Sequence, residues 1–115
     1  LVAQAHDIGY RVVVAKMEGL QAAGMRGAWD TLRSRGVDAA VLLGADVESG
    51  KAIMVAAGSD GAVANGFDAG RIVREMAPSV GGRGGGKAAM AQGGGDDASG
   101  LDAALDVAKT ILGVE

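Results

Sequence analysis

Two basic side chains, Arg83 and Lys87, stand within the stretch GGRGGGKAAMAQGGG, residues 81–95, of which eight are glycine. Glycine reaches backbone conformations closed to other residues and lets a ligand approach the backbone closely. Such a stretch could expose N–H groups that bind a phosphate or another polyanion together with the two cations. It could equally form tight turns around a buried strand, so the residues by themselves leave both interpretations open.

The spacing Gly81-x-x-x-x-Gly86-Lys87 matches the first seven positions of a P-loop. The eighth position of that motif is a Ser or Thr that holds Mg²⁺, and here it is Ala88. A P-loop also follows a strand and opens a helix, whereas this stretch follows a segment with a helical pattern. These mismatches argue against ATP hydrolysis, and the lack of G-x-G-x-x-G in the stretch argues against a dinucleotide site.

The rest of the chain offers no recognisable catalytic constellation. It has no Cys, and its serines lack the neighbouring base that nucleophilic catalysis requires. The single histidine, His6, cannot build a histidine-rich zinc site, and we interpret it as an exposed or capping residue. Asp96 and Asp97 lack further ligands, which is more typical of a solvated turn than of a metal site. We therefore expect no catalytic residue, no metal site and no cofactor in this chain.

Composition bounds the class of protein. The 115 residues are 49% hydrophobic but only 3% aromatic, which indicates one core built from Ala, Val, Leu, Ile and Met. The lack of cysteine is compatible with a reducing cytoplasm, and no apolar run is long enough to span a bilayer. The net charge of −3 does not favour nucleic acid, but residues 96–115 hold five acids and one base, which leaves room for a basic face elsewhere.

The elements that position these residues follow from hydrophobic periodicity. Apolar and β-branched runs predict strands at Tyr10–Met17, Asp38–Ala45, Lys51–Ala57 and Ala88–Gln92, the second and third joined as an antiparallel hairpin. Apolar faces predict helices over Leu20–Arg35, Asp68–Met76 and a final segment capped by Ser99, while residues 62–67 read as a loose connection. We therefore expect one α/β domain over residues 1–115, a two-layer arrangement with a mixed sheet of about four strands covered by helices, in the order β-α-β-β-α-β-α.

Two further arginines, Arg26 and Arg33, lie seven residues apart on the first predicted helix. They share the side away from its apolar face, where a solvated surface is the simpler interpretation. They could also extend a basic surface around Arg83 and Lys87. Trp29 falls within the apolar stripe of the same helix, which favours core packing over stacking on a nucleobase.

The stretch 81–95 resembles a signature near the end of alanyl-tRNA synthetases, in their C-terminal domain of the DHHA1 type. The family pattern runs roughly GG-basic-GGG-basic-Pro-Asp-Met-Ala-Gln-Ala-Gly-Gly, and this chain departs from it at Ala88, Ala89 and Gly93. Weaker similarity covers nearly the whole chain. Related phosphodiesterases carry a similar glycine loop with a histidine in the place of Lys87, whereas the Met-Ala-Gln at 90–92 is similar to the synthetase branch.

The resemblance implies a non-catalytic module that binds the elbow of tRNA and couples aminoacylation with editing in a parent alanine–tRNA ligase. ATP, magnesium and zinc sites would belong to other domains of that parent. Because the chain opens without Met, we expect a fragment of a cytoplasmic synthetase whose remaining domains are its partners. Recognition of the elbow goes by shape and backbone, which the glycine stretch with its cations suits. The expected RNA-binding residues are Arg83, Gly84, Gly85, Gly86, Lys87, Arg26 and Arg33.

Two alternatives stay open at this point. A flat glycine loop also allows close approach between proteins, so the domain could mainly form a homodimer. It could also be the substrate-binding half of an oligonucleotide phosphodiesterase. In each case we expect the loop to be constrained by its backbone, so that a β-branched residue at Gly85 disrupts binding or folding.

Overall fold

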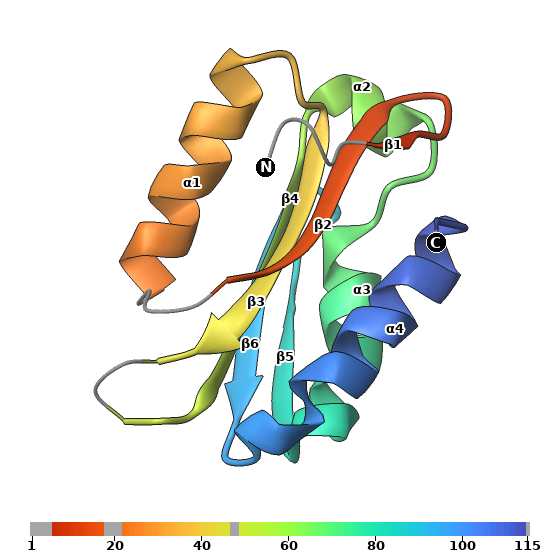
Figure 1. Ribbon diagram of the computed structural model, residues 1–115. Helices are drawn as coiled ribbons and strands as arrows, with labels where there is room; N and C mark the ends of the chain where they lie inside the picture. The colour runs from red at the N-terminus through yellow and green to blue at the C-terminus, as the bar shows by residue number, and fades with distance from the viewer. Residues whose placement is uncertain (1–5, 18–21, 47–48, 115) are drawn as a thin grey trace.

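Six strands form one mixed sheet in the computed structural model, which describes residues 6–17, 22–46 and 49–114, apart from the side chains at 17, 22, 23, 25 and 26 (Figure 1). The strands run in the spatial order β1-β2-β3-β4-β6-β5. β2 and β3 are parallel, and every other neighbouring pair is antiparallel. The bounds are β1 His6–Asp7, β2 Arg11–Met17, β3 Ala39–Ala45, β4 Ala52–Gly58, β5 Gly82–Gly86 and β6 Met90–Gly95.

Helices lie against both faces of this sheet, α1 on one side and α3 with α4 on the other (Figure 1). Their bounds are α1 Ala22–Ser34, α2 Asp60–Ala64, α3 Ala69–Met76 and α4 Leu101–Leu112, with 3₁₀ turns at Ala77–Val80 and Ala98–Gly100. The expected α/β class with a mixed sheet is confirmed. The described residues form six strands rather than about four, and helices pack on two faces rather than in a single second layer.

Alternation along β4 explains why the sheet carries a core on each face. Met54 is fully buried in the same cluster as Ile72 of α3, whereas the next residue, Val55, packs with Trp29 and Leu32 of α1. Neighbouring residues of a strand point to opposite faces, so a continuous apolar run supplies both cores. Trp29 is only 4% exposed, which confirms core packing for this side chain.

Two strands, β1 and β5, were not predicted from the sequence, for different reasons. β1 has two residues, His6 and Asp7, which is too short for any periodicity, and it pairs with the start of β2. His6 is therefore a half-buried strand residue rather than part of a frayed terminus. β5 consists of glycines around Arg83, and glycine is among the residues that strands generally avoid.

The connection after β4 is a correction to the sequence interpretation. Residues 60–64, which we expected to lie mostly in a loose segment, form the short helix α2. Ser59 is its N-cap, and the Ser59 hydroxyl accepts a hydrogen bond from the N–H of Ala62 at 3.2 Å. Ala62 is fully buried. A cap and one buried side chain define this helix, and neither produces a visible apolar period over so few residues.

Replacing Ser59 by Ala is expected to lower the free energy of unfolding by about 1 kcal/mol, because it removes the acceptor for an N–H group at the start of α2. Ser34→Ala is the matched control, since the Ser34 hydroxyl donates to the carbonyl of Thr31 at the exposed end of α1. That change should stay within about 0.5 kcal/mol of the original protein. Urea denaturation of the two variants measures the difference, and equal values would show that Ser59 does not act as a cap.

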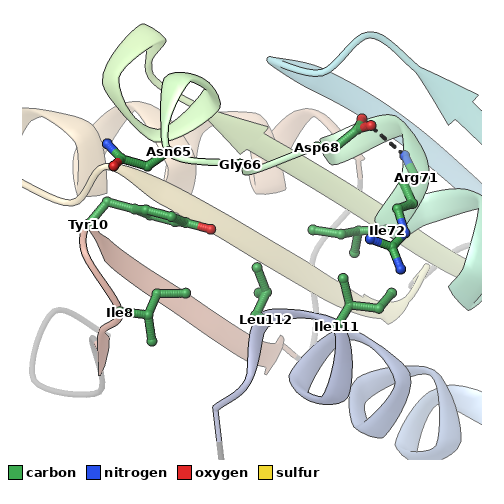
Figure 2. A pocket seen from close by; sticks show the side chains of 9 residues that line it. All are labelled: Ile8, Tyr10, Asn65, Gly66, Asp68, Arg71, Ile72, Ile111 and Leu112. Carbon is green, nitrogen blue, oxygen red and sulfur yellow. Dashed lines mark hydrogen bonds between the residues drawn. The ribbon is translucent and has the colours of Figure 1, made fainter.

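α3 begins and ends where local chemistry predicts. Asp68 is the N-cap, and its carboxylate accepts a hydrogen bond from the backbone N–H of Arg71 at 3.3 Å (Figure 2). The α-helix ends at Met76, two residues before Pro78, because proline has no backbone N–H to donate to the carbonyl four residues earlier. Ala77 keeps helical angles, φ −56° and ψ −41°, and begins the 3₁₀ turn. This agrees with the predicted segment and fixes the first turn of α3 beside the glycine stretch.

α4 differs from expectation at its start. Ser99 does not cap it: the Asp97 carboxylate accepts from the N–H of Ser99 at 3.1 Å, and the N-cap of α4 is Gly100, without a side-chain hydrogen bond. The helix ends at Gly113 in the left-handed conformation, as predicted. Within the described ranges, none of the helices has the length and apolar character needed to cross a membrane.

Candidate functional site

The glycine stretch is a β-hairpin rather than an open loop. β5 pairs with β6 along its whole length, and β6 pairs on its other side with β4. β5 is the last strand of the sheet. The ladder therefore uses the backbone groups of β6 on both sides, while β5 keeps one edge without a neighbouring strand in the described part of the chain.

Main-chain hydrogen bonds hold the turn of this hairpin in place. The carbonyl oxygens of Lys87 and Ala88 accept from the first two N–H groups of α3, at 3.1 and 2.9 Å. The carbonyl of Ala89 accepts from the N–H of Gly58 at the end of β4, at 2.9 Å. These contacts do not depend on the side chains at 88 and 89, where this chain has Ala. They also occupy the start of α3, so its N-terminal N–H groups are not available to a phosphate.

Close packing explains the spacing of the glycines. A β-carbon on Gly84 would lie 2.5 Å from Cγ1 of Val73 in α3 and 2.7 Å from the α-carbon of Gly93 in β6. A β-carbon on Gly93 would meet the same Val73 atom at 2.9 Å. Real β-carbons do not approach other atoms so closely, so α3 can rest on these strands only where side chains are missing.

Gly85 is not constrained in this way. A β-carbon there would meet only the side chain of Arg74, at 3.5 and 3.9 Å, which is ordinary van der Waals contact. Its φ angle is not positive either. The backbone constraint that we expected at Gly85 is therefore wrong, and the constrained position is its neighbour Gly84. An effect of a β-branched residue at Gly85 on binding stays a prediction.

The register of the strands gives the direction of Arg83. Gly85 pairs with Gln92 of β6, Gln92 pairs with Val55 of β4, and Val55 faces α1. Because side chains alternate along a strand, Arg83, two residues before Gly85, lies on that same side. Lys87 follows the last residue of β5 and belongs to the turn of the hairpin. α1 packs over β3 and β4, whereas Arg83 and Lys87 belong to the β5–β6 hairpin at the end of the sheet, and both are exposed.

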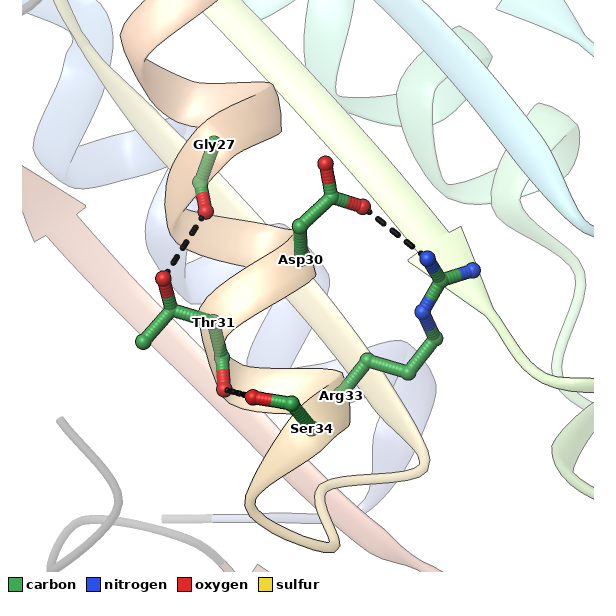
Figure 3. A network of polar contacts seen from close by, with 5 residues as sticks. All are labelled: Gly27, Asp30, Thr31, Arg33 and Ser34. Atoms are coloured by element: carbon green, nitrogen blue, oxygen red, sulfur yellow. Dashed lines mark hydrogen bonds and ion pairs between the residues drawn. The ribbon is translucent and has the colours of Figure 1, made fainter.

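Charge compensation separates the expected cations. Among the described residues, neither Arg83 nor Lys87 forms an ion pair. Arg33 pairs with Asp30 at 3.1 Å, and its guanidinium carbon lies 6.0 Å from the centre of the Trp29 ring (Figure 3). The side chain of Arg26 lies outside the described part of the structure. The hairpin thus carries two uncompensated cations, whereas Arg33 already has an acidic partner.

Two side chains near the hairpin were missed by sequence reasoning. The side chain of Arg74, on α3, lies beside β5. A β-carbon on Gly85 would lie 3.5 Å from Cγ of Arg74, and a β-carbon on Gly70 would lie 3.2 Å from its Nη1. No carboxylate pairs with Arg74 in the ranges that the structure describes. Met90, the first residue of β6 after the turn, is hydrophobic and 41% exposed. Position on α3 gave no signal for Arg74, because only the packing of α3 on β5 brings it to this surface.

The acidic pair Asp96 and Asp97 is used structurally. Asp96 forms an ion pair with Lys51 at 3.4 Å, and Asp97 accepts from both the N–H and the hydroxyl of Ser99. Residues 6–17, 22–46 and 49–114 contain no group of three or more His, Cys, Asp or Glu side chains arranged to hold a metal ion.

Comparison with known proteins places this arrangement in context. The family model described as "DHHA1 domain" matches residues 9–113. An alanine–tRNA ligase from Myxococcus xanthus is 45% identical over 107 residues, which covers 92% of this chain and 12% of the ligase. The alanine–tRNA ligase of Corynebacterium jeikeium is 42% identical over 115 residues, which covers 97% of this chain and 13% of that protein. The chain thus spans about an eighth of the length of these curated relatives.

A solved structure has the same fold. The crystal structure of the C-Ala domain from Aquifex aeolicus alanyl-tRNA synthetase superposes with a TM-score of 0.72 at 25% sequence identity. The alignment covers 94% of this chain and 96% of that domain. The fold described above is therefore similar to that of this C-Ala domain over nearly all of the domain's length.

Proposed function

Because this chain belongs to the DHHA1 domain family, we propose that it is a non-catalytic tRNA-binding module of an alanine–tRNA ligase. In this proposal the domain binds the elbow of tRNA and couples aminoacylation with editing in the parent enzyme. The chemistry, with its ATP, magnesium and zinc, belongs to the remaining domains, which are the partners of this one in the cytoplasm. The domain itself contributes binding and positioning.

The observation that carries the proposal is the pair of uncompensated cations on the hairpin. Arg83 lies in β5, and Lys87 follows four residues later in the turn that ends this strand. The turn that bears Lys87 is held by main-chain hydrogen bonds, so the two charges keep a defined spacing. Cations at a fixed spacing suit contacts to a sugar–phosphate backbone, which position an RNA without reading its sequence.

Gly85 lies on the same side of the sheet as Arg83 and leaves that surface flat, whereas Gly84 faces α3 and, like Gly86, is proposed to contact RNA through its backbone. Without side chains between the two cations, an RNA backbone can approach the strand closely. Arg74, which lies along β5, is positioned to add a third cation to this surface. Arg33 and Arg26 on α1 form its proposed extension, with Arg33 contributing less because Asp30 already neutralises it.

Binding to three RNAs tests the proposal. The tRNA for alanine and an unrelated tRNA should bind with similar affinity, because the elbow is common to all tRNAs and is recognised by shape. An isolated acceptor-stem hairpin lacks the elbow and should bind at least tenfold more weakly. Filter binding at several salt concentrations measures all three affinities. Equal binding of the hairpin and whole tRNA would place the contact elsewhere, and aminoacylation or deacylation by the purified domain would contradict its non-catalytic role.

A further inference from the structure

A pocket of about 230 Å³ lies among the start of β2, the connection between α2 and α3, and the end of α4 (Figure 2). Its residues belong to the side of the sheet that α3 and α4 cover, whereas Arg83 lies on the other side. Four branched aliphatic side chains contribute to the walls, namely Ile8, Ile72, Ile111 and Leu112, and the other lining residues are Tyr10, Asn65, Gly66, Asp68 and Arg71.

One polar group in this pocket has no counterpart in the fold. Tyr10 is 9% exposed, and Figure 2 shows its hydroxyl directed into the pocket. Among the described residues the hydroxyl has no hydrogen-bond partner, and the ring is held edge-on against Phe67, with centroids 6.1 Å apart and an interplanar angle of 80°. Burial raises the pKa of Tyr10, so at neutral pH the phenol is protonated and available as a donor.

A second donor comes from Arg71 on α3. Its Nε donates to Glu75 at 2.8 Å, and its two terminal nitrogens have no partner in the described part of the chain. Figure 2 shows the guanidinium turned toward Ile111 at the side of the pocket. Asp68, the other charged residue of the lining, uses its carboxylate to accept from the backbone N–H of Arg71. The amide of Asn65, which also lines the pocket, donates to the carbonyl of Gly61 at 2.8 Å. The donors without a partner in the described part of the chain are therefore the phenol O–H and the terminal guanidinium N–H groups, beside the one Asp68 oxygen that accepts no hydrogen bond there.

We propose that this pocket binds a carboxylate carried on a short branched apolar group, with its oxygens accepting from Tyr10 and Arg71. Two donors in one pocket beside four aliphatic side chains match an anion joined to an apolar body, and a carboxylate pairs well with guanidinium. The volume equals that of about eight water molecules in the liquid, at about 30 Å³ each. A six-carbon acid such as 4-methylpentanoate has eight heavy atoms and fits this space. The same chemistry occurs at the C-terminus of a peptide that ends in leucine.

The chain contains a single tyrosine, so absorbance of the phenolate reports on Tyr10 alone. Binding of 4-methylpentanoate should raise the pKa of Tyr10 further, because a carboxylate beside the O–H disfavours the phenolate. 4-Methylpentanamide has the same shape without the charge and should leave that titration unchanged. N-acetyl-leucine stands for a peptide terminus: binding as tight as that of 4-methylpentanoate identifies a chain end as an acceptable source, and weaker binding restricts the site to free small acids.

Variants separate the two donors from general packing. Tyr10→Phe keeps the ring against Phe67 and removes only the hydroxyl, and calorimetry should show at least tenfold weaker binding of 4-methylpentanoate. Arg71→Gln, on an exposed side chain, should give a similar loss without affecting the fold. Arg74→Ala is the matched control, because this arginine lies three residues further along α3 and does not line the pocket, so its affinity should be unchanged.

The proposal is overturned if the amide binds as tightly as the acid, or if Arg71→Gln retains full affinity in a folded protein. An absence of any acid-dependent change in the Tyr10 titration would overturn it as well. None of these measurements contains RNA, so their failure would leave the proposed tRNA binding intact.

Discussion

The change Gly84→Ala is expected to lower the free energy of unfolding by about 3 kcal/mol or more, because overpacking costs about 1–3 kcal/mol and sometimes more. The added β-carbon would lie 2.5 Å from Val73 and 2.7 Å from the α-carbon of Gly93. Neither contact is with the flexible end of a side chain, so relief requires α3 to move away from the hairpin. Against a total stability of about 5–15 kcal/mol for a typical domain, this loss is large. Urea denaturation followed by circular dichroism measures it.

Gly85→Ala is the matched control for this prediction. It makes the same chemical change one residue along the same strand, where the β-carbon meets only the stem of Arg74 at ordinary distance. Its stability should stay within about 1 kcal/mol of the original, and reduced freedom of the unfolded chain favours a small gain. If both variants lost stability equally, β-strand geometry in general, and not the contact with α3, would explain the glycines.

The double change Arg83→Ala, Lys87→Ala is expected to weaken tRNA binding by on the order of tenfold or more, since each hydrogen bond to a charged group contributes about 1.5–3 kcal/mol. Different tRNAs should be affected about equally, because phosphate contacts carry no sequence information. The dependence of affinity on salt should also become less steep, by roughly one unit of slope or slightly less for each lost contact. Filter binding across a salt series gives both quantities.

Two single variants serve as comparisons for the double variant. Arg33→Ala removes a cation that already pairs with Asp30 and should change affinity much less. Arg74→Ala removes the uncompensated cation along β5 and should weaken binding and flatten the slope by one further contact. All these side chains are exposed, so thermal stability should change little. Normal tRNA affinity of the double variant in a folded protein would exclude the hairpin as the binding surface.

Gly84 and Arg83 are neighbours, and the predictions give them separate roles. Gly84 allows α3 to rest on the hairpin, which sets the position of the strand. Arg83 uses that position to present its charge on the other side of the sheet. Gly84→Ala should therefore lower stability, whereas the double change at Arg83 and Lys87 should lower tRNA affinity with little change in stability.

Local chemistry in the sequence was sufficient for much of the fold. Apolar β-branched runs identified β2, β3 and β4, because a strand buried on both faces needs such residues wherever it lies. Asp68 and Pro78 marked the two ends of α3, through capping and through the backbone N–H that proline lacks. The glycine signature with Arg83 and Lys87 was by itself enough to indicate the DHHA1 family. These features depend on a few neighbouring residues, which a sequence displays directly.

Tertiary structure alone decided how the glycine stretch is used. Nothing in residues 81–95 reveals that β6 lies between β4 and β5, because glycines have no side chains from which a buried face could be predicted. Gly84 and Gly85 are indistinguishable in sequence, and they differ only because Val73 of α3 lies over one and Arg74 beside the other. The surface position of Arg74 was missed for the same reason, because it depends on the packing of α3 on the sheet, between segments distant along the chain. The short helix after Ser59 was missed because a cap and one buried side chain give no apolar period over so few residues.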